Sequence, residues 1–142
     1  MNDTGMPRVE SAGMRHWRII SANREFYGKA YWSGSKARAW GGRDYLDGAP
    51  QQTLTRLVRR HLLPDGGRVL EVGCAFGYLT RNLRRDGFTA FGCDTSGYCL
   101  AHADAAVRGA LQAASVLALP YPDRSFDLVL CMEVLEHLPE EL

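Results

Sequence analysis

Apolar residues recur at helical spacing from Gln52 to Leu63, which predicts a helix that ends at Pro64. Glycines then turn the chain, and three apolar residues surround Glu71 in the run from 69 to 72. A short apolar run that follows a turn is typical of a buried strand. The pattern therefore begins with a helix and a strand.

A glycine-bearing turn leads to a second amphipathic segment. Leu79 and Leu83 define its apolar stripe, and Gly87 is suited to end the helix. The other positions of this segment are rich in arginine. We expect these arginines on the outer face of the helix: Arg81, Arg84 and Arg85.

Three further strands are predicted, over 88–93, 111–116 and 126–132. The last is a continuous apolar run, typical of a strand covered on both faces. Between the first two, Thr95 or Ser96 can cap a helix. We expect its inward face to carry Cys99, Leu100, Ala103, Ala106 and Val107. This order predicts an α/β fold, a doubly wound and mostly parallel sheet.

Composition is that of one globular domain, with 142 residues, 46% hydrophobic, 23% charged and a net charge of +1. This small charge gives no field that favours nucleic acid. We find neither a signal peptide nor an apolar run of about 18 residues, so a cytoplasmic protein without a membrane partner is expected. The four cysteines lack zinc spacing and predict buried or incidental thiols, with no metal.

The turn after the first strand is the most informative segment. A dinucleotide site needs the pattern G-x-G-x-x-G. Here alanine takes the second glycine position and the third glycine comes one place early, so the turn reads Gly73, Cys74, Ala75, Phe76, Gly77. The carboxylate of Glu71 would fit poorly beside two phosphates and would suit a cation.

With Glu71 included, this turn resembles the first motif, E/D-x-G-x-G-x-G, of class I S-adenosylmethionine-dependent methyltransferases, with Ala75 in place of the middle glycine. Segments 88–94, 111–127 and 128–138 resemble later parts of the family's domain, in the family's order. The resemblance implies S-adenosyl-L-methionine as cofactor and methyl transfer to a small-molecule acceptor. It does not choose oxygen, nitrogen or carbon as the acceptor atom.

The same resemblance implies roles for particular residues. Glu71 and the turn 73–77 would hold the amino-acid end of the cofactor. Asp94, which lies 23 residues after Glu71, would hold the ribose, with Thr95 beside it. Ser115 and Val116 would lie at the adenine, where the family commonly has an acid in place of Ser115.

Two residues after the fourth strand are expected near the methyl acceptor. His137 is the candidate general base, because histidine titrates near neutral pH; alternatively it is a structural residue that orients the loop. Glu133 is expected to be a backbone or cofactor contact.

Residues 1–50 would form an arm and an aromatic-rich helical cap, and residues 51–142 the cofactor-binding domain. In the family such a cap often covers cofactor and substrate. Half of the 14 aromatic residues lie before residue 50. Tyr31, with Tyr27 and Trp32, could place a ring beside a sulfonium; the alternative is that these rings pack helices onto the sheet.

The resemblance implies strand order 3-2-1-4, with the later strands of the family absent. A bare edge at the fourth strand would follow. We expect either the N-terminal portion of a longer enzyme or a complementing chain, for instance in a homodimer. A non-catalytic cofactor-binding subunit is the second interpretation, and a nucleotide-dependent oxidoreductase is a distant third.

Overall fold

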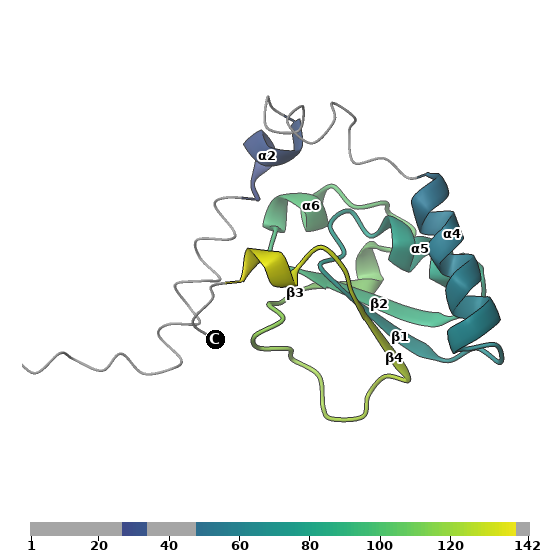
Figure 1. The fold of residues 1–142 in the computed structure, drawn as a ribbon. Helices are drawn as coiled ribbons and strands as arrows, with labels where there is room; N and C mark the ends of the chain where they lie inside the picture. The colour runs from purple at the N-terminus through teal and green to yellow at the C-terminus, as the bar shows by residue number, and fades with distance from the viewer. Residues whose placement is uncertain (1–26, 34–47, 139–142) are drawn as a thin grey trace, which may run out of the picture.

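Four parallel strands form the sheet of the computed structural model, which describes residues 27–33 and 48–138. The strands are β1 (Arg68–Val72), β2 (Thr89–Asp94), β3 (Leu111–Ala113) and β4 (Leu128–Cys131). Their order is β3-β2-β1-β4 (Figure 1), which confirms the order and the α/β class expected from the sequence.

One face of the sheet is covered by two helices. Helix α4 (Ala49–Leu57) continues as the π-helical turn η1 (Val58–Leu62), and α5 (Tyr78–Arg85) packs beside it. Alternate strand residues face these helices. The resulting core contains Val58, Val69, Leu79, Leu83, Phe88 and Ala90.

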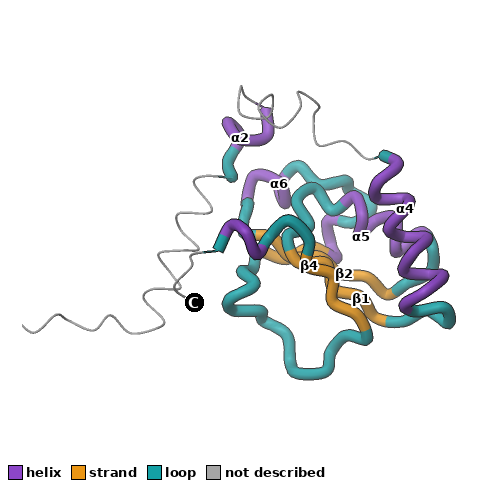
Figure 2. The backbone as a smooth tube through the Cα atoms, viewed as in Figure 1, coloured by secondary structure: helices purple, strands orange, loops and turns teal. Residues whose placement is uncertain are grey.

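The opposite face is covered by the long loop between β3 and β4 (Figure 2). Leu70, Val72 and Cys93 are buried there against loop residues that include Val116, Leu119, Tyr121 and Phe126. The loop does not cover the whole edge strand. Val129, which lies in register with Leu70, is 50% exposed. The expectation that β4 is covered on both faces is therefore wrong for the described part of the chain.

The helix after β2 is shorter than its pattern predicted. Helix α6 covers only Gly97–Ala101, since the Asp104 carboxylate accepts the Ala106 N–H at 2.9 Å and makes a turn. Ala103 and Val107 are buried as expected, but Ala106 is exposed.

The expectation that Arg81 lies on the outer face of α5 is wrong, because Arg81 is buried. Its guanidinium Nη1 lies 2.7 Å from the Asp104 carboxylate and its Cζ lies 5.5 Å from the Tyr78 ring centroid. The ion pair joins α5 to the turn that ends α6. Arg84 and Arg85 are exposed, as expected.

Short helices complete the described chain: α2 (Lys29–Ser33), η2 (Arg108–Ala110) and η3 (Leu135–His137). No helix in these parts of the chain is long and apolar enough to cross a membrane. The N-terminal arm and most of the expected cap, residues 1–26 and 34–47, lie outside the described residues. Within the expected cap, the structure describes residues 27–33, which include α2, and residues 48–50, where α4 begins. The division of the chain into a cap and a domain stays a prediction.

Candidate functional site

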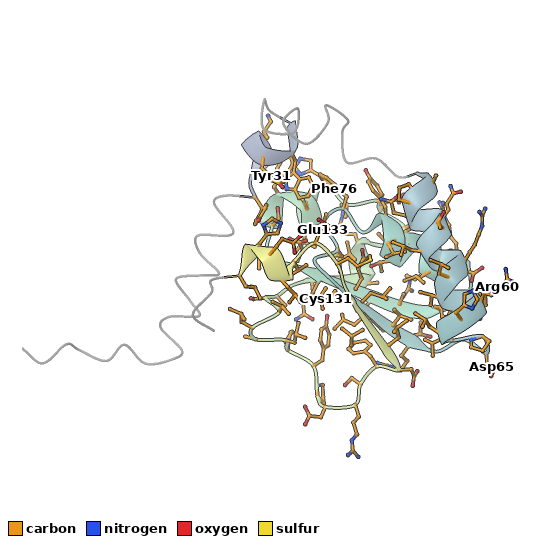
Figure 3. The ribbon with its side chains drawn as sticks, viewed as in Figure 1. Tyr31, Arg60, Asp65, Phe76, Cys131 and Glu133 are labelled. Atoms are coloured by element: carbon orange, nitrogen blue, oxygen red, sulfur yellow. The ribbon has the colours of Figure 1, made fainter. Side chains whose placement is uncertain are left out.

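A cavity of about 290 Å³ opens where the carboxyl ends of all four strands meet. Parallel strands present their carboxyl ends at one edge of the sheet, which is the usual ligand position in such folds. Residues at or just beyond the end of each strand line it, and α2 and η3 also contribute lining residues. Figure 3 shows Tyr31 and Glu133 at this end of the molecule and Arg60 and Asp65 far from it. The lining consists of Tyr27, Tyr31, Trp32, Val72, Gly73, Asp94, Thr95, Ala114, Ser115, Val116, Glu133, Val134, His137 and Leu138.

The turn after β1 is bonded to the end of β2. The N–H groups of Gly73 and Cys74 donate to the Cys93 carbonyl at 2.8 and 3.0 Å. Gly73 has a positive φ of 77°, and a Cβ there would lie 2.3 Å from Val134 Cγ2. Only glycine allows the close approach of this turn to the chain after β4.

Ala75 adopts the left-handed conformation with φ 46°, at the position where the family pattern has its middle glycine. Its N–H donates to Asp94 Oδ2 at 2.7 Å. A charge-assisted hydrogen bond of this kind stabilises a backbone conformation that costs alanine energy. Asp94 thus explains how the turn keeps its shape with alanine.

Asp94 ends β2 and lies in the cavity wall. Its Oδ1 accepts the Ser96 N–H at 2.7 Å, while Oδ2 accepts that of Ala75. Burial raises the pKa of this carboxyl, and the N–H groups of Ser96, Ala75 and Thr95 oppose that rise. A carboxylate has about four lone-pair positions, so two bonds leave it able to accept ligand hydroxyls.

Glu71 is buried and faces away from the cavity. Its Oε2 accepts the Thr80 N–H at 2.8 Å and also the Thr80 hydroxyl. Side chains alternate along a strand, so Glu71 shares the helix-facing side of β1 with Val69, whereas Val72 faces the cavity. Burial raises the pKa of Glu71 to about 7, and the Thr80 bonds oppose the rise.

Aromatic rings from the N-terminal segment form one wall of the cavity. Tyr27 and Tyr31 meet edge to face with centroids 4.8 Å apart, and Tyr27 lies 5.5 Å from the His137 ring. Trp32 packs edge to face against Phe76 of the glycine turn at 5.2 Å (Figure 3 labels Tyr31 and Phe76). The wall therefore contacts both the turn and the chain after β4.

Tyr27 is held as a neutral phenol. Burial raises its pKa to about 12, with Tyr31, Asp94 and Glu136 adding to the rise.

Ser115 lies in the cavity wall after β3 and is buried. Its Oγ accepts the Leu117 N–H at 3.2 Å, and its carbonyl accepts that of Ala118 at 3.0 Å. These bonds fix the start of the loop. The Ser115 hydroxyl proton remains available to a ligand in the cavity.

The charge of the lining is negative. Asp94 and Glu133 carry carboxylates, and the lining contributed by the described residues contains no lysine or arginine. Glu133 has a positive φ of 52°, at the start of the turn after β4. A negative wall beside aromatic rings is suited to a positively charged ligand.

Comparison with known proteins gives the same family as the resemblance of the first motif. The family model described as "Methyltransferase domain" matches residues 70–142, about half of the chain. The chain belongs to the S-adenosylmethionine-dependent methyltransferase family. Membership confirms the resemblance seen in the first motif.

Curated relatives are similar to this chain over part of its length. The ubiquinone biosynthesis O-methyltransferase of Ralstonia nicotianae is 42% identical over 82 residues, covering 53% of this chain and 34% of that protein. The protein of the same name from Agrobacterium fabrum is 32% identical over 100 residues, covering 67% and 40%. The chain thus spans between a third and two fifths of the length of these relatives.

One solved structure shows the fold. The magnesium protoporphyrin IX methyltransferase of Synechocystis PCC 6803, solved with bound SAM, matches 85% of this chain and 64% of its own length. The TM-score is 0.57 and the identity 20%, so the likeness is one of fold alone.

Most of the site residues that were singled out from the sequence lie together in the cavity wall. These are Tyr31, Gly73, Asp94, Thr95, Ser115, Val116, Glu133 and His137. The structure does not place the others in the lining of the cavity: Glu71, Cys74, Ala75, Phe76 and Gly77. Cys74 is buried and burial raises its thiol pKa, while Gly77 begins α5 with φ 74°. The ligand roles given to all of these residues stay predictions.

Four apolar lining residues were not singled out from the sequence: Val72, Ala114, Val134 and Leu138. An apolar residue at the end of a strand has the pattern of a core residue. The sequence signal that could have identified these residues is their position at or after the end of a predicted strand, because the carboxyl ends of parallel strands face the ligand.

Proposed function

We propose that this chain binds S-adenosylmethionine in the cavity and transfers its methyl group to a small molecule. One observation carries the proposal: Asp94 ends β2 inside a cavity that carboxylates and aromatic rings line, beside a left-handed turn of the family's first motif. The cofactor is cationic at sulfur and would supply a methyl group activated for nucleophilic attack. The negative, aromatic wall has the chemistry to hold it.

Within this proposal, different residues bind different parts of the cofactor. Asp94 would accept ribose hydroxyls with its remaining lone pairs. Ser115 and Val116 would meet the adenine, and Gly73 would allow close approach to the amino-acid end. Glu71 would act on the ligand indirectly, because its carboxylate is bonded to Thr80 of α5 and so joins the two elements that flank the turn.

The acceptor is proposed to be an uncharged, ring-bearing molecule with a hydroxyl. The curated relatives are named ubiquinone biosynthesis O-methyltransferases, which supports oxygen as the acceptor atom. The rings of Tyr27 and Tyr31 offer edges and faces to an aromatic acceptor. The carboxylates of Asp94 and Glu133 disfavour an acceptor that carries its own negative charge.

His137 is proposed as the general base. It lines the cavity from η3, and its ring contacts that of Tyr27, which fixes its orientation. An imidazole nitrogen would take the proton of the acceptor hydroxyl, and the acceptor oxygen could then receive the methyl group that the cofactor would release from its sulfur. Positioning by the aromatic wall would supply the alignment that this attack requires.

Calorimetric titration with S-adenosylhomocysteine tests the cofactor assignment. We expect binding by the wild-type protein, no measurable binding of NAD, and at least about tenfold weaker binding by Asp94→Asn, because the amide turns a donor toward one of two N–H groups. Asp127→Asn is the matched control, since Asp127 also accepts a backbone N–H, from Arg68 at 2.8 Å, far from the cavity. Equal affinity of the two variants would remove Asp94 from the site.

Turnover with two acceptors tests the substrate class. Catechol is neutral and 3,4-dihydroxybenzoate carries a carboxylate near neutral pH. We expect methyl transfer from radiolabelled S-adenosylmethionine to catechol in preference to the acid. A preference for the acid would contradict the charge argument while leaving cofactor binding in place.

A second candidate is a cofactor-binding chain that another chain must complete. The observation in its favour is the edge of the described sheet at β4, where Val129 and, just after the strand, Met132 are 50% and 36% exposed. Binding of S-adenosylhomocysteine without turnover of either acceptor would favour this candidate. Dimerisation in analytical ultracentrifugation would then indicate a second copy as the complement.

A further inference from the structure

Ser96 joins the aromatic wall to the cofactor side of the cavity. It follows β2 by two residues and is fully buried. Its backbone N–H donates to Asp94 Oδ1 at 2.7 Å, and its hydroxyl donates to the Tyr27 carbonyl at 2.6 Å. One residue thus contacts both the carboxylate that ends β2 and the segment that carries three cavity rings.

The hydroxyl of Ser96 has both of its functions occupied. While it donates to Tyr27, its oxygen accepts the Cys99 N–H at 3.2 Å and so caps α6. The capping bond to α6 therefore fixes the Ser96 side chain independently of its bond to Tyr27. A donor that is fixed in this way can help to set the position of the segment whose carbonyl it bonds.

The Tyr27 carbonyl is the point where the wall is attached. It accepts the Ser96 hydroxyl and also Trp32 Nε1 at 3.0 Å. The second bond closes the segment Tyr27 to Trp32 on itself, and the first attaches it to α6, beside which α2 lies (Figure 1). Both bonds meet at one acceptor, so they position Tyr27, Tyr31 and Trp32 together.

The geometry points to Ser96 as a positioning residue that holds the aromatic segment over the cavity. This inference rests on the proposed function for its effect on ligand binding, but not for its effect on the segment itself. Ser96 does not line the cavity; it acts through the Tyr27 carbonyl. Without its hydroxyl, the rings would leave the wall more often and a bound ligand would dissociate faster.

Ser96→Gly separates this role from helix capping. Glycine is tolerated at an N-cap almost as well as serine, so α6 should persist. The donor to Tyr27 is lost. We expect hydrogen exchange of the α2 amides to rise about fivefold or more, with exchange in β1 and β2 unchanged, and S-adenosylhomocysteine to bind about tenfold more weakly.

Ser125→Gly is the matched control. Its hydroxyl also donates to a backbone carbonyl, that of Pro122 at 2.6 Å, but in the loop that precedes β4. We expect no change in α2 exchange or in affinity. A double-mutant cycle with Trp32→Phe adds a second measurement: because both donors share one acceptor, their effects on α2 exchange should not be additive.

The outcomes distinguish this inference from the proposed function. Unchanged α2 exchange in Ser96→Gly, with the variant folded, overturns the inference whatever the protein binds. Raised exchange with wild-type affinity overturns the link to the ligand. Failure of the wild-type protein to bind S-adenosylhomocysteine would reject the proposed function, while raised α2 exchange in the variant would still support the positioning role.

Discussion

Glu71 and Thr80 form a buried pair beneath the glycine turn, with one carboxylate oxygen accepting both the N–H and the hydroxyl of Thr80. The pair connects the middle of β1 to the first half of α5. Gly92 of β2 lies in register with Glu71, and a Cβ at Gly92 would lie 2.8 Å from Thr80 Oγ1. The pair therefore joins the strand before the turn to the helix after it, and a side chain at Gly92 would disturb this pair.

Burial of Glu71 predicts a pH-dependent stability. Its pKa is raised from 4.5 to about 7 in the folded protein, so the folded state binds more protons than the unfolded state between these values. Stability from this group is full below the unfolded pKa and is lost as pH rises through 7. The total change is on the order of 3 kcal/mol.

Urea denaturation at several pH values measures this effect when wild type is compared with Glu71→Gln, which cannot titrate. The free energy of unfolding of wild type relative to the variant should fall between pH 5 and 8. Asp94 also has a raised pKa, but it is present in both proteins and cancels. A constant difference across this range would show that Glu71 titrates at its ordinary pKa.

Thr80→Val is expected to destabilise the protein by about 1–3 kcal/mol, because it leaves a buried carboxylate with one hydrogen bond fewer at nearly unchanged volume. The pH at which Glu71 loses its proton should rise further, since the Thr80 bonds oppose the shift. Thr89→Val, at an exposed strand position, is the control and should change stability by less than about 0.5 kcal/mol. Equal stability of the two variants would contradict the role of the pair.

Much of this arrangement follows from local pattern. The apolar runs and the turn glycines predicted the strands and the position of Asp94, because strand ends and turns are set by nearby residues. The strand order was implied by the resemblance to the methyltransferase family. The alternation along β1 also indicates which way the Glu71 side chain points. It lies on the same face as Val69, which packs on the helices. The family motif drew attention to its charge instead.

Other features depend on partners distant in sequence. Arg81 has the pattern of a solvated helix residue, and its burial follows from Asp104, which lies 23 positions later in the chain. The attachment of Tyr27 to Ser96 joins residues 69 positions apart. Neither contact has a local signal, since any polar residue in those segments would give a similar pattern.

Gly73→Ala should disrupt the turn. The φ of 77° is unfavourable for alanine, and its Cβ would overlap Val134 Cγ2. We expect a loss of about 1–3 kcal/mol in stability and weaker binding of S-adenosylhomocysteine. Gly109→Ala is the control, because nothing lies within 4 Å of a Cβ built there. Thermal unfolding and calorimetry measure both effects, and a stable Gly73→Ala protein with wild-type affinity would rule out the close approach.

His137→Gln tests the proposed base. Glutamine keeps a polar side chain on η3 but cannot take a proton, so turnover should fall about a hundredfold or more while affinity for S-adenosylhomocysteine stays close to that of wild type. A residue that only orients the loop would give the opposite result, with weaker binding and turnover that recovers at saturating ligand. The ratio of the change in kcat to the change in KM therefore separates the two roles.

The control for this prediction is His102→Gln, because His102 is exposed, lies outside the cavity wall, and uses Nδ1 only for a contact of 2.8 Å with the Tyr98 carbonyl. Its turnover should equal that of wild type. Initial rates over a range of catechol concentrations, at saturating S-adenosylmethionine, measure both variants. Full turnover by His137→Gln would remove the base from His137 and leave the acceptor proton to water, since alignment of the acceptor hydroxyl would then be enough for the reaction.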